Sequence, residues 1–256
     1  MFFDTHAHVN DRRFDGDRHE FIMSLEQNGI CAFTEIGYDT DSSVAAIELA
    51  NKYNRVYAAV GVHPADVDKL DENGLQQIEK MLYEPKVVAL GEIGLDYHFD
   101  DSPSRECQKY WFEAQIQVAK RKNMPIVVHS RDAMEDTINV LKASGASEGI
   151  IHCYSGSVES AKILLDMGFY ISIAGPVTFK NAGKLLEVAK YVPNDRILIE
   201  TDSPYLAPEP NRGKRNCPVY VKHVCEKIAQ LRGISVEEFA QITKNNAKAV
   251  YKIKQL

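Results

Sequence analysis

Short apolar runs alternate with amphipathic segments along almost the whole chain, and this alternation limits the possible folds more than any other feature. The runs lack the regular alternation of apolar and polar residues that a strand with one solvent-exposed face shows, which is typical of parallel strands buried on both faces. The expected strands are Phe2–His6, Ile30–Ile36, Val56–Val60, Val87–Leu90, Ile126–Val128, Gly149–Ile151, Phe169–Ile173 and Ile197–Ile199. Helical patterns follow these strands at residues 21–25, 42–53, 75–82, 105–122, 137–143, 158–167, 182–191, 219–231 and 236–250.

Eight strand–helix units joined by short connections predict an α/β protein, and we expect a single (β/α)8 TIM barrel with an extra C-terminal helix. An open dinucleotide-binding sheet is disfavoured because no Gly-x-Gly-x-x-Gly follows the first strand. No linker or low-complexity tract interrupts the pattern, so residues 1–256 are expected to form one domain. The loops after the first and eighth strands are expected to be the longest and to shape the mouth of the barrel.

The charge and cysteine content limit the binding partners and the cellular compartment expected for this chain. A net charge of −6 disfavours electrostatic binding along duplex nucleic acid, although a local metal site can still bind a phosphate. The five cysteines lie far apart without a Cys-x-x-Cys pair, which favours reduced thiols over a disulfide framework. No apolar run is long enough to cross a membrane and no signal peptide is visible. We therefore expect a cytoplasmic protein that is a monomer or a weak oligomer.

Residues of the kinds that bind metals stand at the ends of several expected strands. His6 and His8 lie two positions apart at the end of the first strand, so their side chains point to the same face. Later strands lead to Glu92, His129, His152 and Asp202. The carboxyl ends of all strands meet at one face of a barrel, where the active sites of this fold are built. We therefore expect these six residues to converge.

Each strand-end histidine, taken alone, is as readily explained as a hydrogen-bonded core residue. Five of the eight histidines nevertheless fall on or just after expected strands: His6, His8, His63, His129 and His152. The other three lie on helices or loops, where solvated or locally bonded side chains are common: His19, His98 and His223. Burying carboxylates such as Glu92 and Asp202 also requires a partner, and metal cations supply one. The pattern as a whole favours a metal site.

Four imidazoles and two carboxylates exceed the needs of one tetrahedral zinc ion and suit two divalent ions that share a carboxylate. Glu92, from the middle of the barrel, is the expected bridge. Asp202 lies nearer the rim than Glu200, so Asp202 is the expected ligand and proton acceptor. For Glu200, a role in orienting a histidine is as plausible as a role as a ligand. Zn, Mg and Mn all accept such mixed ligands. Cys153 is expected to point away from the site and to pack between barrel and helices.

Seven stretches spread over nearly the whole chain carry a family resemblance: Asp4–His8, Gly61–Pro64, Gly91–Tyr97, His129–Arg131, His152–Gly156, Gly175–Asn181 and Glu200–Leu206. Together they resemble the motifs of the TatD family of metal-dependent deoxyribonucleases, which are amidohydrolase-like barrels. The resemblance implies ligand roles for His6, His8, Glu92, His129, His152 and Asp202. It also places His63 and Arg131 in the substrate pocket, and we expect Tyr154 and Arg215 to bind substrate there. Cys217 stands where the family usually has Glu or Gln, which concerns the substrate loop and not the metal ligands.

The predicted activity is metal-assisted hydrolysis of phosphodiesters in DNA, with Asp202 and Glu92 as catalytic residues. We expect 3′–5′ exonuclease action on single-stranded DNA ends, because the mouth of a barrel admits a strand end more easily than a continuous duplex. The alternative is a hydrolase that uses the same site on another ester or an amide, such as an aminoacyl-tRNA deacylase or a small-molecule amidohydrolase. A binding protein that retains the site as a relic is disfavoured, because binding alone does not need converging buried charges.

Overall fold

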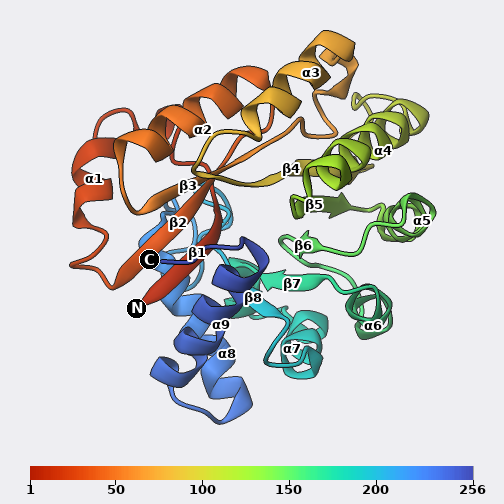
Figure 1. The fold of residues 1–256 in the computed structure, drawn as a ribbon. Helices are drawn as coiled ribbons and strands as arrows, with labels where there is room; N and C mark the ends of the chain where they lie inside the picture. Colours follow the sequence, from red (N-terminus) through yellow and green to blue (C-terminus); the bar gives the residue numbers. More distant parts are fainter. Residues whose placement is uncertain (256) are drawn as a thin grey trace.

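The computed structural model, which describes residues 1–255, is a barrel of eight parallel strands enclosed by helices (Figure 1). The strands pair in chain order from β1 to β8. Their bounds are β1 Phe2–Ala7, β2 Ile30–Ile36, β3 Val56–Val60, β4 Val87–Asp96, β5 Ile126–Arg131, β6 Gly149–Ile151, β7 Tyr170–Ile173 and β8 Ile197–Ile199. The expected fold class is confirmed.

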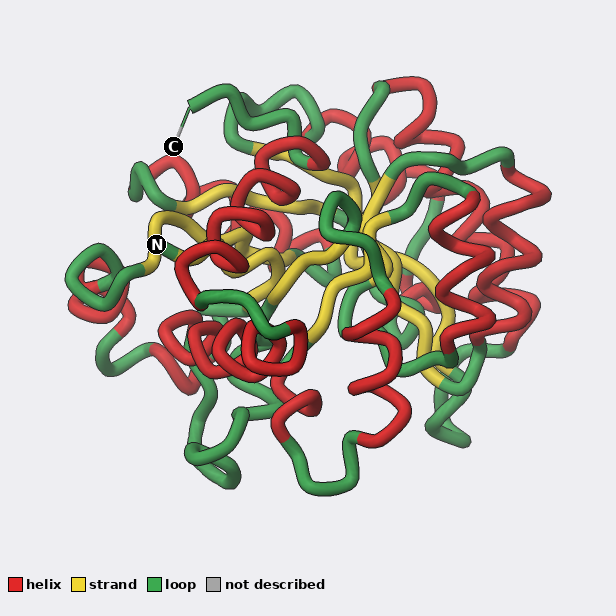
Figure 2. The backbone as a smooth tube through the Cα atoms, turned by 90° about the horizontal axis from the view of Figure 1, so that it is seen from below, coloured by secondary structure: helices red, strands yellow, loops and turns green. Residues whose placement is uncertain are grey.

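One α-helix follows each strand, and α9 follows α8 as the last helix of the described residues (Figure 1). Figure 2 shows the helices, in red, around the strands, in yellow. The helices are α1 Arg18–Ser24, α2 Thr40–Lys52, α3 Glu72–Met81, α4 Arg105–Lys122, α5 Met134–Ser144, α6 Val158–Asp166, α7 Gly183–Tyr191, α8 Val221–Arg232 and α9 Val236–Val250. Helices α2 and α3 begin two to three residues before their apolar pattern. Asp39 and Asp71 explain this, because their side chains accept backbone hydrogen bonds from the first turn and cap these helices.

Two expected strand ends were wrong, and both concern the site. The predicted strands stop at Leu90 and Val128, but β4 continues to Asp96 and β5 to Arg131. Glycines and polar residues in these stretches hide the strand pattern from sequence reasoning. Glu92 and His129 therefore lie within paired strands and not in loops beyond them.

Buried polar groups close the barrel between β1 and β8, where a single bridge pairs Ala7 with Ser203. The Asp4 carboxylate accepts hydrogen bonds from the backbone N–H of Thr201, at 2.9 Å, and from its hydroxyl. The hydroxyl of Thr5 donates to the carbonyl of Ile199 at 3.1 Å. These contacts hold the end of β8 against β1, which carries His6 and leads into His8.

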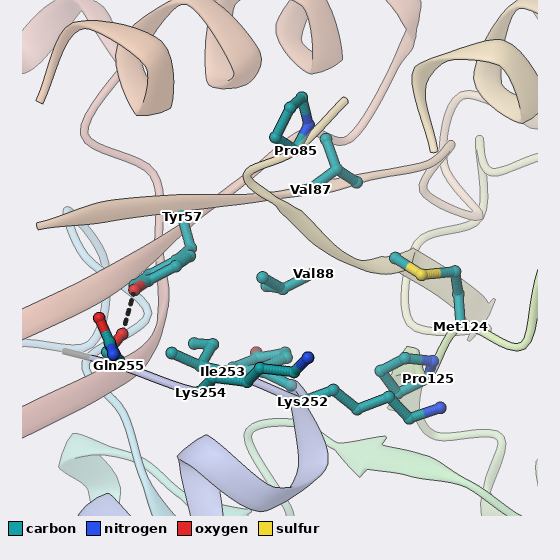
Figure 3. Close-up of a pocket in the computed structure, with 11 residues that line it drawn as sticks. Tyr57, Pro85, Val87, Val88, Met124, Pro125, Lys252, Ile253, Lys254 and Gln255 are labelled. Carbon is teal, nitrogen blue, oxygen red and sulfur yellow. Dashed lines mark hydrogen bonds between the residues drawn. The ribbon is translucent and has the colours of Figure 1, made fainter. Parts of the chain in front are cut away.

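The C-terminal segment covers the opposite end of the barrel, where the strands begin. Helix α9 packs against β1 and β8, and the buried hydroxyl of Tyr251 donates to the carbonyl of Thr5 at 2.7 Å. The hydroxyl of Tyr57 donates to the carbonyl of Gln255 at 3.1 Å, which holds the tail across the starts of β3 and β4 (Figure 3). A pocket of about 350 Å³ remains beneath the tail. Among the described helices, none is both long and apolar enough to span a membrane.

Replacing Asp4 with alanine is expected to destabilise the protein by about 3 kcal/mol, because it leaves a buried N–H and a buried hydroxyl without an acceptor. Urea denaturation measures the change in the free energy of unfolding. Asp100→Ala, which removes an exposed carboxylate, is the control and is expected to stay within about 0.5 kcal/mol of the parent protein. An Asp4→Ala protein as stable as this control would contradict the role of Asp4 in barrel closure.

Candidate metal centre

Two glycines in β4 direct Glu92 into the barrel. Gly91 and Gly94 have positive φ values of 152° and 142°. A Cβ atom on either would collide with a backbone carbonyl of β5, that of Val127 or of His129. The pairing of β4 with β5 shifts register between Leu90 and Ile93, as is typical of a bulge. This irregular, closely packed backbone carries Glu92, which is 5% exposed, to the floor of the mouth.

The two carboxylate oxygens of Glu92 face different pairs of histidines. Its Oε1 atom lies 2.8 Å from Nε2 of His152 and 3.0 Å from Nδ1 of His129. Its Oε2 atom lies 3.5 Å from Nε2 of His6 and 3.7 Å from Nε2 of His8. Asp202 completes the second group, with Oδ1 3.5 Å from Nε2 of His8. The structure thus brings together all six residues expected as ligands.

Two of the four imidazoles have a second hydrogen-bond partner that fixes their orientation, and a third has a carboxylate nearby. A ring nitrogen of His8 donates to the carbonyl of Ile36 at 3.1 Å. Asp96 lies 3.0 Å from Nε2 of His129, and Glu200 lies 3.4 Å from Nδ1 of His152. Carboxylates and carbonyls in such positions hold metal-binding histidines in the correct tautomer. Glu200 lies beside His152 and also accepts a hydrogen bond from the backbone N–H of Cys153.

The closely spaced nitrogen and oxygen atoms of these residues are arranged as ligands of divalent cations. Nε2 of His6 lies 3.2 Å from Nε2 of His8, and Nδ1 of His129 lies 3.1 Å from Nε2 of His152, so the ring nitrogens converge in a buried site. The ligand atoms form groups within 4.8 Å, including His6–His8–Glu92 and Glu92–His129–His152. Cations between these atoms satisfy both the imidazoles and the buried carboxylates.

The carboxylates of the site are held in the ionised form. Burial by itself would raise the pKa of Glu92, but the imidazoles around it, His152 foremost, lower that pKa well below its usual range. Burial would likewise raise the pKa of Asp202, but its hydrogen bond with His8 and the nearby His6 and His152 lower it. Both residues are therefore available as anionic ligands.

His63 is oriented as a donor and not as a ligand, although it shares a cluster with Asp96 and His129. Its Nδ1 atom accepts a hydrogen bond from the backbone N–H of Ala65 at 3.1 Å, so the neutral ring carries its proton on Nε2. Burial lowers the pKa of His63 to about 3, which keeps the ring neutral. Its Nε2–H points toward Glu92, at 3.7 Å from Oε1.

A pocket of about 470 Å³ lies over the metal centre. Its lining residues come from the loops after β1, β2, β3, β4 and β8 as well as from the strands: His8, Asp11, Tyr38, His63, Asp66, Glu92, Asp96, Phe99, His129, Arg131, Asp202 and Tyr205. The expectation that the loops after the first and eighth strands shape the mouth was incomplete, because three further loops contribute side chains.

The structure brings His63 and Arg131 into this pocket but not Tyr154 or Arg215. Tyr154 is 2% exposed, and its hydroxyl donates to the carbonyl of Ser157 at the start of α6. The guanidinium of Arg215 forms two hydrogen bonds with the carboxylate of Asp17, at 2.7 and 2.6 Å, which direct it away from the metal centre. Both substrate-binding assignments are therefore corrected by local hydrogen bonds that the sequence does not reveal.

Cys153 also departs from its expected place. Its φ of 43° turns the chain after β6, and its backbone N–H donates to Glu200. The thiol is not a member of either described hydrophobic cluster, and it lies within reach of the charges of the site. Burial, together with the charges of Asp202, Glu200 and Glu92, raises the pKa of the thiol well above its usual range.

Sequence reasoning missed Asp96 and the aromatic residues of the rim. Asp96 stands two residues beyond Gly94 in an apparent loop, and only the continuation of β4 places it against His129. The signal that was available is the alternation of Glu92, Gly94 and Asp96 on one face of a strand. Tyr38, Phe99 and Tyr205 follow strands in the same way, but nothing in the sequence distinguishes them from the other exposed aromatic residues.

Known proteins resemble this chain over nearly its whole length. Residues 3–252 match the profile of a family described as TatD related DNase. The uncharacterized metal-dependent hydrolase YabD of Bacillus subtilis is 48% identical over 255 residues, which cover 99% of this chain and 100% of that protein. The crystal structure of YJJV, a TatD homolog from Escherichia coli, superposes with a TM-score of 0.93 at 30% identity, covering 98% of each chain. A TatD family hydrolase from Entamoeba histolytica gives a TM-score of 0.86 at 25% identity, covering 98% of this chain and 97% of that one.

Asp96→Asn is expected to weaken the binding of metal at His129 by about 10- to 100-fold, because it removes the charge of the acceptor that orients this ring. Competition with a chromophoric chelator measures the affinity of each metal equivalent. Asp100→Asn changes an exposed carboxylate of the following loop and serves as the control. Equal affinities in the two variants would show that Asp96 does not orient the ligand.

Metal affinity is expected to rise with pH between about 6.5 and 9. Burial would lower the pKa of His8, but its hydrogen bond with Asp202 and the charge of Glu92 raise it to about 9 in the metal-free protein. Because the raised pKa keeps this imidazole protonated below about pH 9, the metal must displace a proton, at a cost of up to about tenfold in affinity per pH unit. Calorimetry in buffers with different ionisation enthalpies counts the released protons. Binding without proton release at pH 7 would contradict this expectation.

Proposed function

Because this chain belongs to the TatD-related DNase family and is a metal-dependent hydrolase, we propose that it is a deoxyribonuclease that shortens single-stranded DNA from the 3′ end. The observation that carries the proposal is the Glu92 carboxylate, whose two oxygens face separate histidine pairs at the floor of an open pocket. Shared carboxylates of this kind are typical of two-ion sites that hydrolyse phosphate esters.

In this proposal the residues around Glu92 would hold two divalent cations, Zn, Mg or Mn. His6, His8 and Asp202 would hold one ion and His129 and His152 the other, with Glu92 between the two groups. When bound, the ions supply Lewis acidity that neutralises charge on phosphate oxygens and makes water more acidic. Glu92 contributes to the reaction by fixing the position of one group of ligand residues relative to the other.

The side chains of the pocket provide the remaining chemistry. Asp202, kept ionised by its hydrogen bond with His8, orients the attacking water and accepts its proton. The Nε2–H of neutral His63 donates to a non-bridging phosphate oxygen. Arg131 supports this binding with a positive charge, since within residues 1–255 no carboxylate forms an ion pair with it.

The shape and charge of the pocket favour a strand end over a continuous duplex. Its volume of about 470 Å³ is small, and the carboxylates of Asp11 and Asp66 stand among its lining residues. Acidic groups at the mouth oppose the tracking of a long phosphate backbone, whereas a single terminal phosphodiester reaches the floor. The five cysteines are free, which supports a reducing compartment such as the cytoplasm.

Asp202→Asn is expected to lower the rate of DNA hydrolysis by at least about 100-fold, because the proton acceptor is lost. The assay follows an end-labelled single-stranded oligonucleotide after EDTA treatment and addition of Mg, Mn or Zn. Asp195→Asn, on the exposed turn after α7, is the control and keeps full activity.

The position of the label reports the direction of cleavage. Stepwise shortening of a 5′-labelled strand, with only a mononucleotide released from a 3′-labelled one, supports 3′–5′ action. Absence of cleavage with every metal would reject the nuclease and direct attention to esters or amides, beginning with aminoacyl-tRNA. Full activity of Asp202→Asn would remove this residue as the proton acceptor.

A further inference from the structure

Three large aromatic side chains are exposed around the metal pocket. Tyr38 is 42% exposed, Tyr205 is 48% exposed and Phe99 is 53% exposed, and all three line the pocket. Exposed aromatic surface is costly in water, and its concentration at one mouth indicates a ligand with flat apolar faces. The metal chemistry uses none of these rings.

The rings stand on two opposite sides of the centre. Tyr38 follows β2 and Tyr205 follows β8, and both present an edge to the metal-binding ring of His8, at centroid distances of 5.9 and 6.2 Å. Phe99 follows β4, next to the strand that carries His129. In an eight-stranded barrel β4 and β5 lie across the mouth from β8 and β1. A ligand strand that crosses the mouth over Glu92 therefore meets Tyr205 on one side of Glu92 and Phe99 on the other.

An arginine accompanies a ring on each side. The guanidinium carbon of Arg13 lies 4.3 Å from the centroid of the Tyr205 ring, and that of Arg131 lies 5.1 Å from the centroid of Phe99. Rings that stack on bases, combined with adjacent positive charge, are how proteins bind single-stranded nucleic acid without reading its sequence. Arg13 is itself engaged by the carboxylate of Asp11 at 2.8 Å, so stacking contributes more than net charge on that side.

We propose that Tyr205 with Arg13, and Phe99 with Arg131, form two stacking platforms that bind the nucleobases on either side of the cleaved phosphodiester. This inference rests on the proposed nuclease function and specifies the substrate further. A base in a duplex has both faces covered by its neighbours, so only unpaired terminal nucleotides can reach the platforms. The platforms tolerate any base, because every base has a flat face.

The test compares two single-stranded oligonucleotides of the same length and phosphate number. One carries normal bases throughout, and the other has tetrahydrofuran abasic residues in its two 3′-terminal positions. The metal-loaded parent protein is expected to cleave the normal strand with a KM about tenfold lower than that of the abasic strand, in line with the stacking of one or two bases. Phe99→Ala and Tyr205→Ala are each expected to reduce this ratio severalfold and to leave the KM of the abasic strand unchanged.

Two further variants separate stacking from other effects. Tyr205→Phe keeps the ring and is expected to retain the ratio of the parent protein. Tyr83→Ala removes a ring that is 72% exposed and accompanied by Lys122 at 4.3 Å, the same kind of pair far from the pocket, and is expected to change nothing. As a reading independent of turnover, 2-aminopurine at the 3′ end is expected to lose fluorescence on binding to Asp202→Asn protein, and to lose less when Phe99→Ala is added.

The outcomes distinguish failure of the stacking platforms from failure of the proposed nuclease function. Cleavage of normal and abasic strands with equal KM would overturn the platforms and leave the nuclease standing. A base preference that survives both alanine variants would also overturn them. If neither strand is cleaved with Mg, Mn or Zn, the proposed function fails, and the inference fails with it.

Discussion

The burial of one carboxylate among four imidazoles is the constraint on which the rest of this structure depends. Glu92 is 5% exposed, and its neighbours His6 and His152 are similarly buried. Isolated charges in such a place cost several kcal/mol each, so the barrel has to deliver compensating groups from several strands at once. A parallel barrel does this without special loops, because the carboxyl ends of all its strands converge on one face.

The same constraint explains the least regular parts of the backbone. Gly91 and Gly94 allow β4 to lie closer to β5 than any side chain at these positions permits, and this close contact sets Glu92 between the two histidine pairs. Asp202 has a positive φ of 56°, and its N–H donates to the carbonyl of His6 at 2.9 Å, so β8 is held to β1 where their ligands meet. Strained conformations of this kind persist where the surrounding structure determines them. Here Asp4 and Thr201 supply that support.

Sequence reasoning found the residues whose position follows from topology and missed those whose position follows from side-chain direction. The convergence of the six expected ligands, His6, His8, Glu92, His129, His152 and Asp202, follows from the strand ends alone. Tyr154 lies in a matching motif and Arg215 in the loop beyond the last one. A hydrogen bond to Ser157 and an ion pair with Asp17 fix these two side chains, and neither lines the pocket. The continuation of β4 past Gly91 was hidden because glycine carries no strand signal. The partnership of Asp96 with His129 was hidden with it.

The composition of the rim bears on how such a site selects its substrate. A protein with a net charge of −6, and with Asp11 and Asp66 in the pocket, gains little from long-range attraction of a polyanion. Affinity must therefore come from contacts at short range, and the exposed rings of Tyr38, Phe99 and Tyr205 are the largest apolar surfaces available there. In the proposed nuclease, ions at the floor would attract one phosphate, and the flat faces beside it would bind the base attached to that phosphate. A duplex would offer the charge without the free faces, so the proposal favours an unpaired end as substrate.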